Sequence, residues 1–291
     1  MSQSVGYTSF QGVGGHGSLL SGCGHILKPL AAGDSRSARE AAFYKALGAA
    51  SPLAPFAPAF FGVREVCGVP HLELEDLTAR FSLPCVLDVK MGSRSTGLDA
   101  PPEKVAREAA KWPPQARLGL RFSGMRVGWR EGAGGEPQWR ACRGEALRGG
   151  LPDDGGDAAP AAALREFLGG GKGRPLRRDV VPPLLARLAA LQLWFSTQSQ
   201  FRFFGSSLLL VYDGDGGAHA PGGDGGGAAA AVAQPPPPPV ELRMIDFAHV
   251  WDAGEEARPG CDEGYLLGLE TLARALRGLL IEAEATAAAP R

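Results

Sequence analysis

The residues most suited to chemistry are an aspartate and a lysine two positions apart, Asp88 and Lys90. Apolar and other residues alternate from Pro84 to Gly92, so the pattern predicts a strand with both charges on one face. A carboxylate can accept a hydroxyl proton while a neighbouring ammonium neutralises phosphate charge, which is the chemistry of phosphoryl transfer. An Asp-x-Lys pair taken alone is more often a simple ion pair on an exposed sheet surface.

A second group of candidate residues lies near the N-terminus. Residues 12–17 satisfy G-x-G-x-x-G, and Lys28 follows in an apolar run. A dinucleotide-binding unit needs a strand before the glycines, whereas here a strand-like run comes after them. A glycine-rich hairpin over nucleotide phosphates, with Lys28 reaching the phosphates, fits better than a flexible tail. Glu40, in a helix predicted over Ser35 to Leu47, is a candidate partner of Lys28 or a solvated helix residue.

Two later segments carry further polar residues. A buried strand is predicted around Ser207, and a strand from Val240 to Val250 leads into Asp246. On that pleat Ile245 and Phe247 point away from Asp246, which leaves the carboxylate free for a cleft. His249 follows closely, although a single histidine is more often a hydrogen-bonded structural residue.

A basic helix follows the Asp-x-Lys strand. Lys104, Arg107 and Lys111 recur at spacings of three and four within strong helix formers, and so share one face. Such a face is usually only solvated. Residues 90–150 nevertheless contain 12 Lys and Arg against 6 Asp and Glu, which is a suitable environment for a polyanion.

Taken together, these segments resemble the inositol polyphosphate kinase family, and its multikinase branch in particular. Pro84, Asp88, Lys90 and Gly92 match the P-x-x-x-D-x-K-x-G signature of that family. Ser206 to Leu209 and Ile245 to Val250 resemble two further family motifs in the expected order. Leu74 to Leu77 and Asp262 to Tyr265 add to the match, which covers the chain from about Gly12 to Leu280.

The resemblance implies ATP and Mg²⁺ as cofactors and inositol polyphosphates as substrates. Lys28 is then expected to hold nucleotide phosphates, backbone groups at Glu75 and Leu77 to hold adenine, and Asp246 with Ser207 to bind Mg²⁺. Lys90 steadies the transferred phosphoryl group and Asp88 orients the attacking hydroxyl. The phosphates already on the ring are assigned to four residues: Lys104, Arg107, Lys111 and His249. Arg107 departs from the family pattern, because multikinases tend to have a neutral amide there.

The expected fold is α+β, a two-lobed kinase-like fold with an antiparallel sheet in the small N-lobe and a larger C-lobe. The lobes are placed at residues 1–77 and 78–291, with the inositol phosphate-binding segment at about 93–118. Further helices are predicted over 181–195 and 265–281, and residues 131–173 are expected to form loops around one short helix at 161–168. Residues 214–239 are rich in Gly, Ala and Pro and are predicted to be a disordered insert. Its proline run is interpreted as a spacer or a polyproline ligand.

Composition indicates where the protein is located in the cell and which partners it is expected to have. Five scattered cysteines without a C-x-x-C pair indicate a reduced intracellular protein, in the cytoplasm or the nucleus, without a zinc site. No apolar run approaches the length of a membrane span, and the net charge is only −1. We therefore expect a monomer with no transmembrane segment and no nucleic-acid partner.

Three other functions compete with this interpretation. An ordinary protein kinase is disfavoured because no H-R-D-x-x-x-x-N catalytic loop occurs in the sequence. An inositol hexakisphosphate kinase, which makes pyrophosphates, shares the motifs and a stretch like Leu176 to Asp179. A catalytically inactive phosphoinositide-binding scaffold would not need to retain all four of the residues Lys28, Asp88, Lys90 and Asp246. The expected acceptors are inositol trisphosphate and tetrakisphosphate, with phosphoinositide head groups as a further class.

Overall fold

The computed structural model describes most of the 291 residues. The described ranges are 7–14, 19–48, 51–132, 134–152, 158–169, 174–215, 238–252 and 260–288. The second half of the glycine motif, residues 15–17, lies outside them, as does nearly all of the predicted disordered insert, at 216–237.

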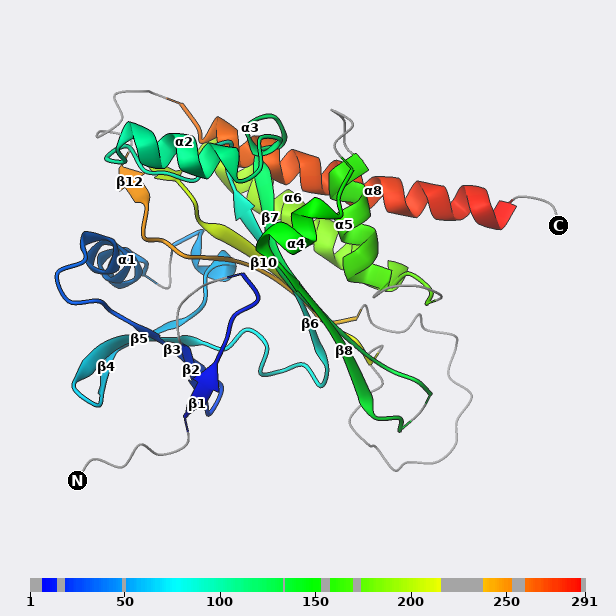
Figure 1. The fold of residues 1–291 in the computed structure, drawn as a ribbon, viewed down its shortest axis with the longest axis horizontal. Helices are drawn as coiled ribbons and strands as arrows, with labels where there is room; N and C mark the ends of the chain where they lie inside the picture. The colour runs from blue at the N-terminus through cyan, green and yellow to red at the C-terminus, as the bar shows by residue number, and fades with distance from the viewer. Residues whose placement is uncertain are drawn as a thin grey trace.

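The N-terminal part of the chain is a five-stranded antiparallel sheet with one helix (Figure 1). The strand order is β1-β2-β3-β5-β4. The strands are β1 (Thr8–Phe10), β2 (Leu19–Gly22), β3 (His25–Pro29), β4 (Phe60–Val66) and β5 (Val69–Glu75). The helix α1 (Ser35–Ala46) begins at Asp34, whose carboxylate accepts a hydrogen bond from the Arg36 N–H and so caps the first turn. The predicted helix is confirmed.

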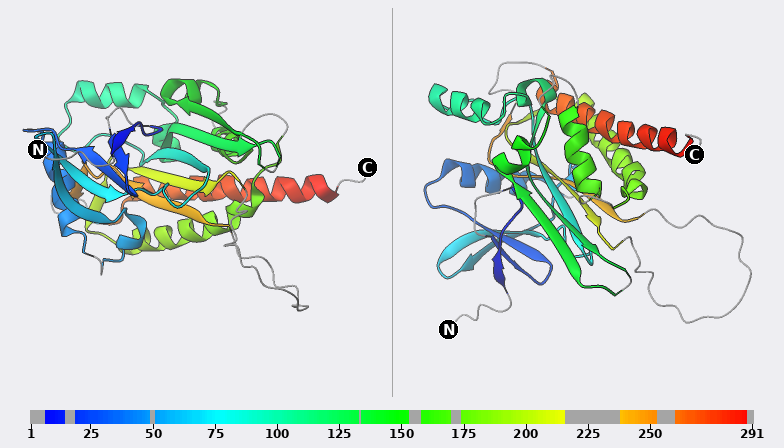
Figure 2. Two further views of the ribbon diagram at one scale, coloured as in Figure 1. Left: turned by 90° about the horizontal axis from the view of Figure 1, so that it is seen from below. Right: turned by 45° about the vertical axis from the view of Figure 1, so that its right-hand side comes forward.

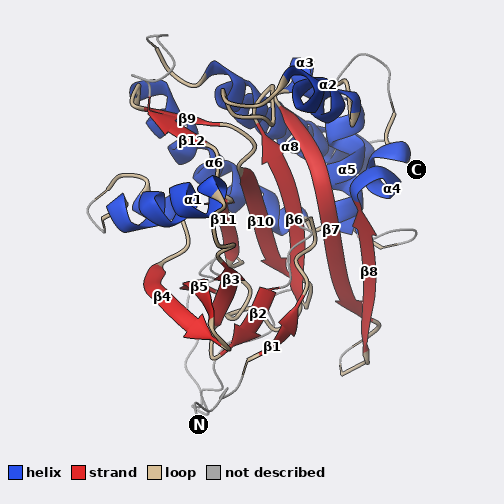
Figure 3. Ribbon diagram, turned by 60° about the vertical axis from the view of Figure 1, so that its left-hand side comes forward, coloured by secondary structure: helices blue, strands red, loops and turns tan. Residues whose placement is uncertain are grey.

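A second five-stranded antiparallel sheet forms the centre of the larger part, in the order β11-β10-β6-β7-β8 (Figure 3). These strands are β6 (Pro84–Met91), β7 (Leu120–Arg130), β8 (Pro137–Arg143), β10 (Ser207–Asp213) and β11 (Val240–Ile245). The Asp-x-Lys strand is therefore central, with β10 and β7 on its two sides. The fold is α+β, as predicted, whereas the lobe boundary at 77/78 stays a prediction.

Helices cover one face of this sheet and leave the other face toward the N-terminal sheet (Figures 1 and 2). The covering helices are α5 (Ala158–Gly169), α6 (Val181–Thr197) and α8 (Glu263–Ala288). Phe195 of α6 stacks on Tyr265 of α8 with ring centroids 4.1 Å apart, and both side chains are fully buried. The remaining elements are short: η1 (Ala54–Phe56), α2 (Pro102–Ala110), α3 (Gln115–Leu118), α4 (Gly144–Gly149), η2 (Arg178–Val180), β9 (Phe201–Phe203) and β12 (Val250–Asp252).

One helix of the described residues, Arg178–Thr197, is long and apolar enough to cross a membrane by length and composition. In the fold its apolar residues Leu184, Leu188 and Leu191 are buried, and the helix packs against α8 and β11. Helices in the core of a protein have the same apolar composition, so packing in the core explains the composition of this helix.

Two sequence predictions were wrong. Residues 131–173 contain β8 and α4 in addition to the predicted helix. Most β8 side chains are exposed, because this strand is at the sheet edge, so no buried period-two pattern marked it. The strand predicted to run through Asp246 instead ends at Ile245, and Asp246 has a left-handed backbone with φ of 64°.

Candidate active site

A cavity of about 380 Å³ lies between the two sheets. Five of the predicted site residues line it: Lys28, Glu75, Leu77, Asp88 and Asp246. They come from β3, from the end of β5 and the connection after it, from β6 and from the position after β11, which are far apart in sequence. Ser207 is fully buried in β10 and is paired in register with Lys90 on one side and Ile245 on the other. The fold thus gathers four of the five cofactor-binding candidates at one cavity and places Ser207 on the strand beside it.

Lys28 is held between two carboxylates. Its Nζ donates to Glu40 Oε1 at 2.8 Å and to Asp246 Oδ1 at 2.7 Å. Burial alone would lower the pKa of Lys28, but the two carboxylates outweigh it and raise the pKa above its ordinary value. Burial disfavours the ionised form of Glu40 and raises its pKa despite Lys28. The ammonium is therefore charged and aimed into the cavity, where it suits nucleotide phosphates.

The left-handed conformation of Asp246 is stabilised by the residue that follows. The Phe247 N–H donates to Glu40 Oε1 at 3.2 Å, and the Phe247 ring is fully buried against Phe43 and Tyr44 of α1. Non-glycine residues rarely adopt this conformation and need such support. The Asp246 side chain is 38% exposed into the cleft. Burial would raise its pKa, yet Lys28 and Lys90 lower it to about 2, so the group is an anion.

Asp88 is buried beneath the glycine segment. A Cβ on Gly14 would lie 2.2 Å from Asp88 Oδ2, and a Cβ on Gly124 of β7 would lie 2.0 Å from the Val13 carbonyl oxygen. Only glycine allows this close approach. Asp88 is 6% exposed, and burial, opposed by Lys90, raises its pKa to about 6.

Lys90 contacts a backbone carbonyl rather than the cavity. Its Nζ donates to the Gly205 carbonyl oxygen at 2.8 Å. Asp88 lines the cavity and Lys90 does not, although the two lie on one strand. The carboxylate can accept a proton only from a hydroxyl that reaches this cavity. The predicted division of labour between the two residues stays a prediction.

The oxygen donors at this cavity fit a hard cation. Asp246 presents an ionised carboxylate to the cleft. The Ser207 hydroxyl lies on the neighbouring strand, where it is fully buried and does not line the cavity. No cluster of three or more His, Cys, Asp or Glu that could hold a metal occurs among the described residues. Mg²⁺ is commonly bound by one or two carboxylates with water and substrate phosphates, so this sparse set suits it.

The substrate-side candidates lie on α2 and next to β12. Lys104 and His249 are close enough that the Lys104 charge, after burial, helps to lower the pKa of His249 to about 4. The imidazole is therefore neutral near pH 7, and its buried Nδ1 has no hydrogen-bond partner among the described residues. Arg107 on α2 is exposed. Lys111 is bound within its own helix, because its Nζ contacts Glu108 Oε1 at 2.5 Å.

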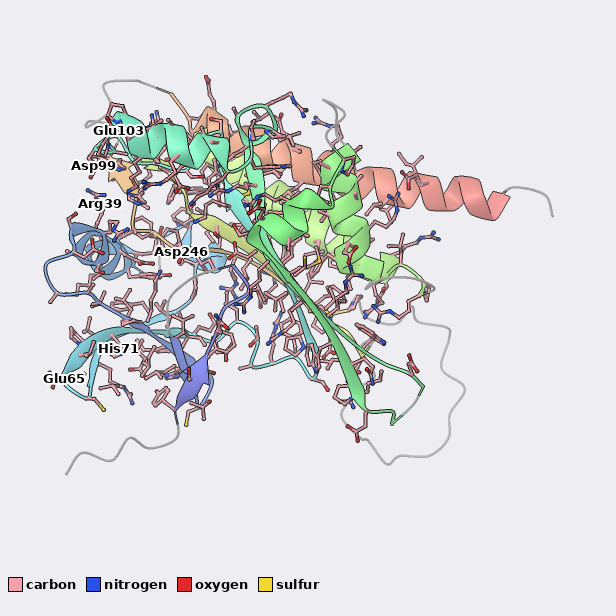
Figure 4. All side chains as sticks on the ribbon, viewed as in Figure 1. Arg39, Glu65, His71, Asp99, Glu103 and Asp246 are labelled. Atoms are coloured by element: carbon pink, nitrogen blue, oxygen red, sulfur yellow. The ribbon has the colours of Figure 1, made fainter. Side chains whose placement is uncertain are left out.

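Sequence reasoning missed Arg39, which links α1 to the substrate side. Its guanidinium donates to the Ala248 carbonyl oxygen at 3.2 Å, pairs with Asp99 at 3.5 Å and lies 4.3 Å from the Trp251 ring centroid. Figure 4 shows the labelled Arg39 and Asp99 near each other. The sequence signal that could have identified Arg39 was its position next to Glu40 on a predicted helix.

Arg126 of β7 was also missed. It lines the nucleotide cavity, lies 5.1 Å from the Trp139 ring centroid, and has a buried Nε for which the described residues supply no hydrogen-bond acceptor.

A lysine paired with a helix carboxylate, and an aspartate facing the same cavity, define a nucleotide site of the kinase type. The model of the inositol polyphosphate kinase family matches residues 71–277. The chain belongs to this family.

Curated relatives come from two of its branches. Inositol polyphosphate multikinase IPK2 of Oryza sativa subsp. indica is 33% identical over 292 aligned positions, covering 91% of this chain and 89% of the relative. Inositol hexakisphosphate kinase 3 of Homo sapiens is 36% identical over 219, covering 72% of this chain and 51% of the relative. The chain thus spans about half the length of the hexakisphosphate kinases that it matches.

A solved structure supports the fold. The inositol phosphate multikinase Ipk2 of S. cerevisiae, in complex with ADP and Mn²⁺, superimposes with a TM-score of 0.66 over 88% of this chain and 99% of that one, at 23% identity. At this identity the likeness is evidence for the fold alone.

Proposed function

We propose that this chain is an ATP- and Mg²⁺-dependent kinase that phosphorylates hydroxyls of inositol polyphosphates, with trisphosphate and tetrakisphosphate as main acceptors. The observation that carries the proposal is Lys28 held between Glu40 and Asp246 at 2.8 and 2.7 Å, at a cavity between two sheets. Membership of the family and the similarity to the rice multikinase support it.

In the proposed reaction the attacking inositol hydroxyl bonds to the γ-phosphorus of ATP as the bond to the leaving ADP oxygen breaks. Mg²⁺ would be held by Asp246 and Ser207 and would neutralise charge on the phosphates. Lys28 binds nucleotide phosphates, Lys90 stabilises the transferred group, and the hydroxyl proton passes to Asp88 or to water. Lys104 and the neutral His249 contact phosphates already on the ring.

An open substrate side supports breadth of substrate. The segment between Gly92 and Gly119 forms α2 and α3, and α2 has no buried residue. Cations on an exposed helix recognise charge more than shape, whereas strict discrimination needs an enclosed polar site. Phosphoinositide head groups are included in the proposal for the same reason. The proposal also includes a monomeric state and an intracellular location.

An inositol hexakisphosphate kinase is the second candidate, because several relatives carry that name. The Leu176 to Asp179 stretch that suggested it has a structural explanation. Arg177 forms a bidentate pair with Asp179 at 2.9 and 2.7 Å and lies 5.3 Å from the Tyr212 ring centroid. Arg177 and Tyr212 do not line the nucleotide cavity. The stretch therefore does not favour either substrate class.

Product analysis tests the proposal. The protein is incubated with Mg²⁺-ATP and a panel of inositol tris-, tetrakis-, pentakis- and hexakisphosphates, and the products are resolved by anion-exchange chromatography. We expect tetrakis- and pentakisphosphate products, with KM for every acceptor rising with salt. Pyrophosphate products alone would favour the second candidate, and no product from any acceptor would support an inactive scaffold.

A further inference from the structure

Helix α2 faces the body of the protein with charged side chains. Among residues 102–110 only Lys104 and Glu108 are half-buried, and the others are exposed. Lys104, Glu108 and Lys111 share a face through spacings of four and three. The described residues place no apolar α2 side chain in the core. The carboxylate of Glu108 thus lies within the face that we assign to substrate phosphates.

Glu108 is bound by two cations. Its Oε1 contacts Lys111 Nζ at 2.5 Å, and its Oε2 lies 3.4 Å from Arg121 Nη2. Burial would raise the pKa of Glu108, but Lys111 and Arg121 outweigh it and lower the pKa. The carboxylate is therefore ionised at neutral pH, and each cation faces an anion before any substrate arrives.

Arg121 connects this cluster to the reaction centre. It is 5% exposed and is the register partner of Lys90 across β6 and β7. Directly opposed residues in an antiparallel pair point to the same face of the sheet. The Glu108 cluster therefore lies on the sheet face of the predicted phosphoryl-stabilising lysine, while the N-terminal end of α2 carries Lys104 toward His249.

We propose that Glu108 is a specificity-determining residue that limits how many substrate phosphates this face binds. By pairing with Lys111 and Arg121 it offsets their charge and repels a phosphate that approaches them. Acceptors with few phosphates use the Lys104 end and avoid this penalty, whereas highly phosphorylated acceptors must displace or tolerate the carboxylate. Selection through a repulsive group is a common way to build specificity. The proposal rests on the proposed function.

A purely structural role for Glu108 is the main alternative, since it also ties α2 to β7. Arg121 Nη1 donates to the Glu108 backbone carbonyl oxygen at 3.2 Å. This bond does not depend on the side chain. The substitution Glu108→Gln keeps this backbone hydrogen bond and keeps a side-chain oxygen that can accept from Arg121. It removes only the negative charge.

Glu103 provides a matched control. It lies in the first turn of the same helix, is exposed, and is labelled at the N-terminal end of α2 in Figure 4. Glu103→Gln changes the net charge by the same amount without touching Lys111 or Arg121.

The experiment compares KM and kcat of the wild type, Glu108→Gln and Glu103→Gln for inositol tris-, tetrakis-, pentakis- and hexakisphosphate. One unit charge about 4 Å from a phosphate in a water-like medium corresponds to roughly a fivefold change in affinity. We expect Glu108→Gln to lower KM by less than about twofold for trisphosphate and by about fivefold or more for pentakis- and hexakisphosphate. The kcat and melting temperature should stay near wild type, and Glu103→Gln should change every KM by less than about twofold.

Three results would overturn the proposal. Equal effects of both substitutions would show a general charge effect. A higher KM for every acceptor together with a lower melting temperature would show that Glu108 only anchors α2. A decrease in the KM of Glu108→Gln that is no larger for acceptors with more phosphates would also exclude the proposal.

The two proposals fail separately. If the wild type phosphorylates no inositol phosphate, the proposed function is wrong. Calorimetric binding of inositol hexakisphosphate to the three proteins still decides the role of Glu108, because a tighter complex is expected for Glu108→Gln alone.

Discussion

Replacing Asp88 by Asn should inactivate the enzyme and stabilise its fold at neutral pH. Asp88 is buried, and its carboxyl pKa is raised from 3.8 to about 6 by burial, with Asp246 adding to the shift and Lys90 and Lys28 opposing it. An acid with a raised folded-state pKa binds protons more tightly when folded. Stability is therefore lost as pH rises between about 4 and about 6, and the full penalty persists above that range.

The magnitude follows from the shift. Two pKa units correspond to about 3 kcal/mol at pH 7. The asparagine side chain is neutral, so it avoids this penalty, but its amide leaves a buried polar group imperfectly paired at a cost of about 1 kcal/mol. The net expectation is a gain of about 2 kcal/mol at pH 7. At pH 4.5 only about 1 kcal/mol of the penalty remains in the wild type. The wild type and Asp88→Asn should therefore have nearly equal free energies of unfolding at that pH.

The assay is urea denaturation of the wild type and Asp88→Asn at pH 7 and pH 4.5, without nucleotide or metal. Glu65→Gln serves as the control, because Glu65 is an exposed carboxylate on β4, away from the cleft (Figure 4). The control should change stability by less than about 0.5 kcal/mol at either pH. A stability difference for Asp88→Asn that is independent of pH, or a loss at pH 7, would refute the reasoning.

Two further predictions concern roles around the cleft. Asp246→Asn and Lys90→Ala should each lower kcat by at least about 10³-fold with the fold retained, because charge at the transferred group acts in the transition state. Lys111→Ala should chiefly raise KM. Similar losses of kcat in all three variants would contradict the assignment. Arg39→Met should raise KM for the inositol phosphate by about tenfold and leave KM for ATP within about twofold, because Arg39 contacts the Ala248 and Trp251 segment beside His249. An equal rise in both constants would contradict that role.

Local patterns predicted the elements that carry the site. The alternation from Pro84 to Met91 identified β6, and the helical spacing of Leu184, Leu188 and Leu191 identified α6. Both signals arise from burial on one strand or one helix face, so they are present in the sequence itself. Gly14 approaches Asp88 more closely than any residue with a Cβ could. The predicted hairpin over nucleotide phosphates stays a prediction, because residues 15–17 lie outside the described ranges.

Contacts between distant elements were not predictable in the same way. The turn at Asp246 depends on Glu40 and Phe43 of α1, about 200 positions earlier, and nothing in the Ile245 to Val250 stretch shows that the strand stops. The pairing of Lys111 with Glu108 was accessible from helix spacing, but only the cations on that face entered the prediction. Their anionic neighbour changes what the face can bind.

Transfer of phosphate from ATP to an inositol phosphate, dependent on Asp246, is the decisive measurement. The wild type and Asp246→Asn are each incubated with Mg²⁺, ATP labelled at the γ-phosphate and inositol trisphosphate, and label in the inositol product is counted. ADP binding and the melting temperature are measured in parallel to show that both proteins are folded. We predict labelled tetrakisphosphate from the wild type and at least about 10³-fold less from Asp246→Asn. Equal labelling by the two proteins, or label released only as inorganic phosphate, would contradict this assignment of the site.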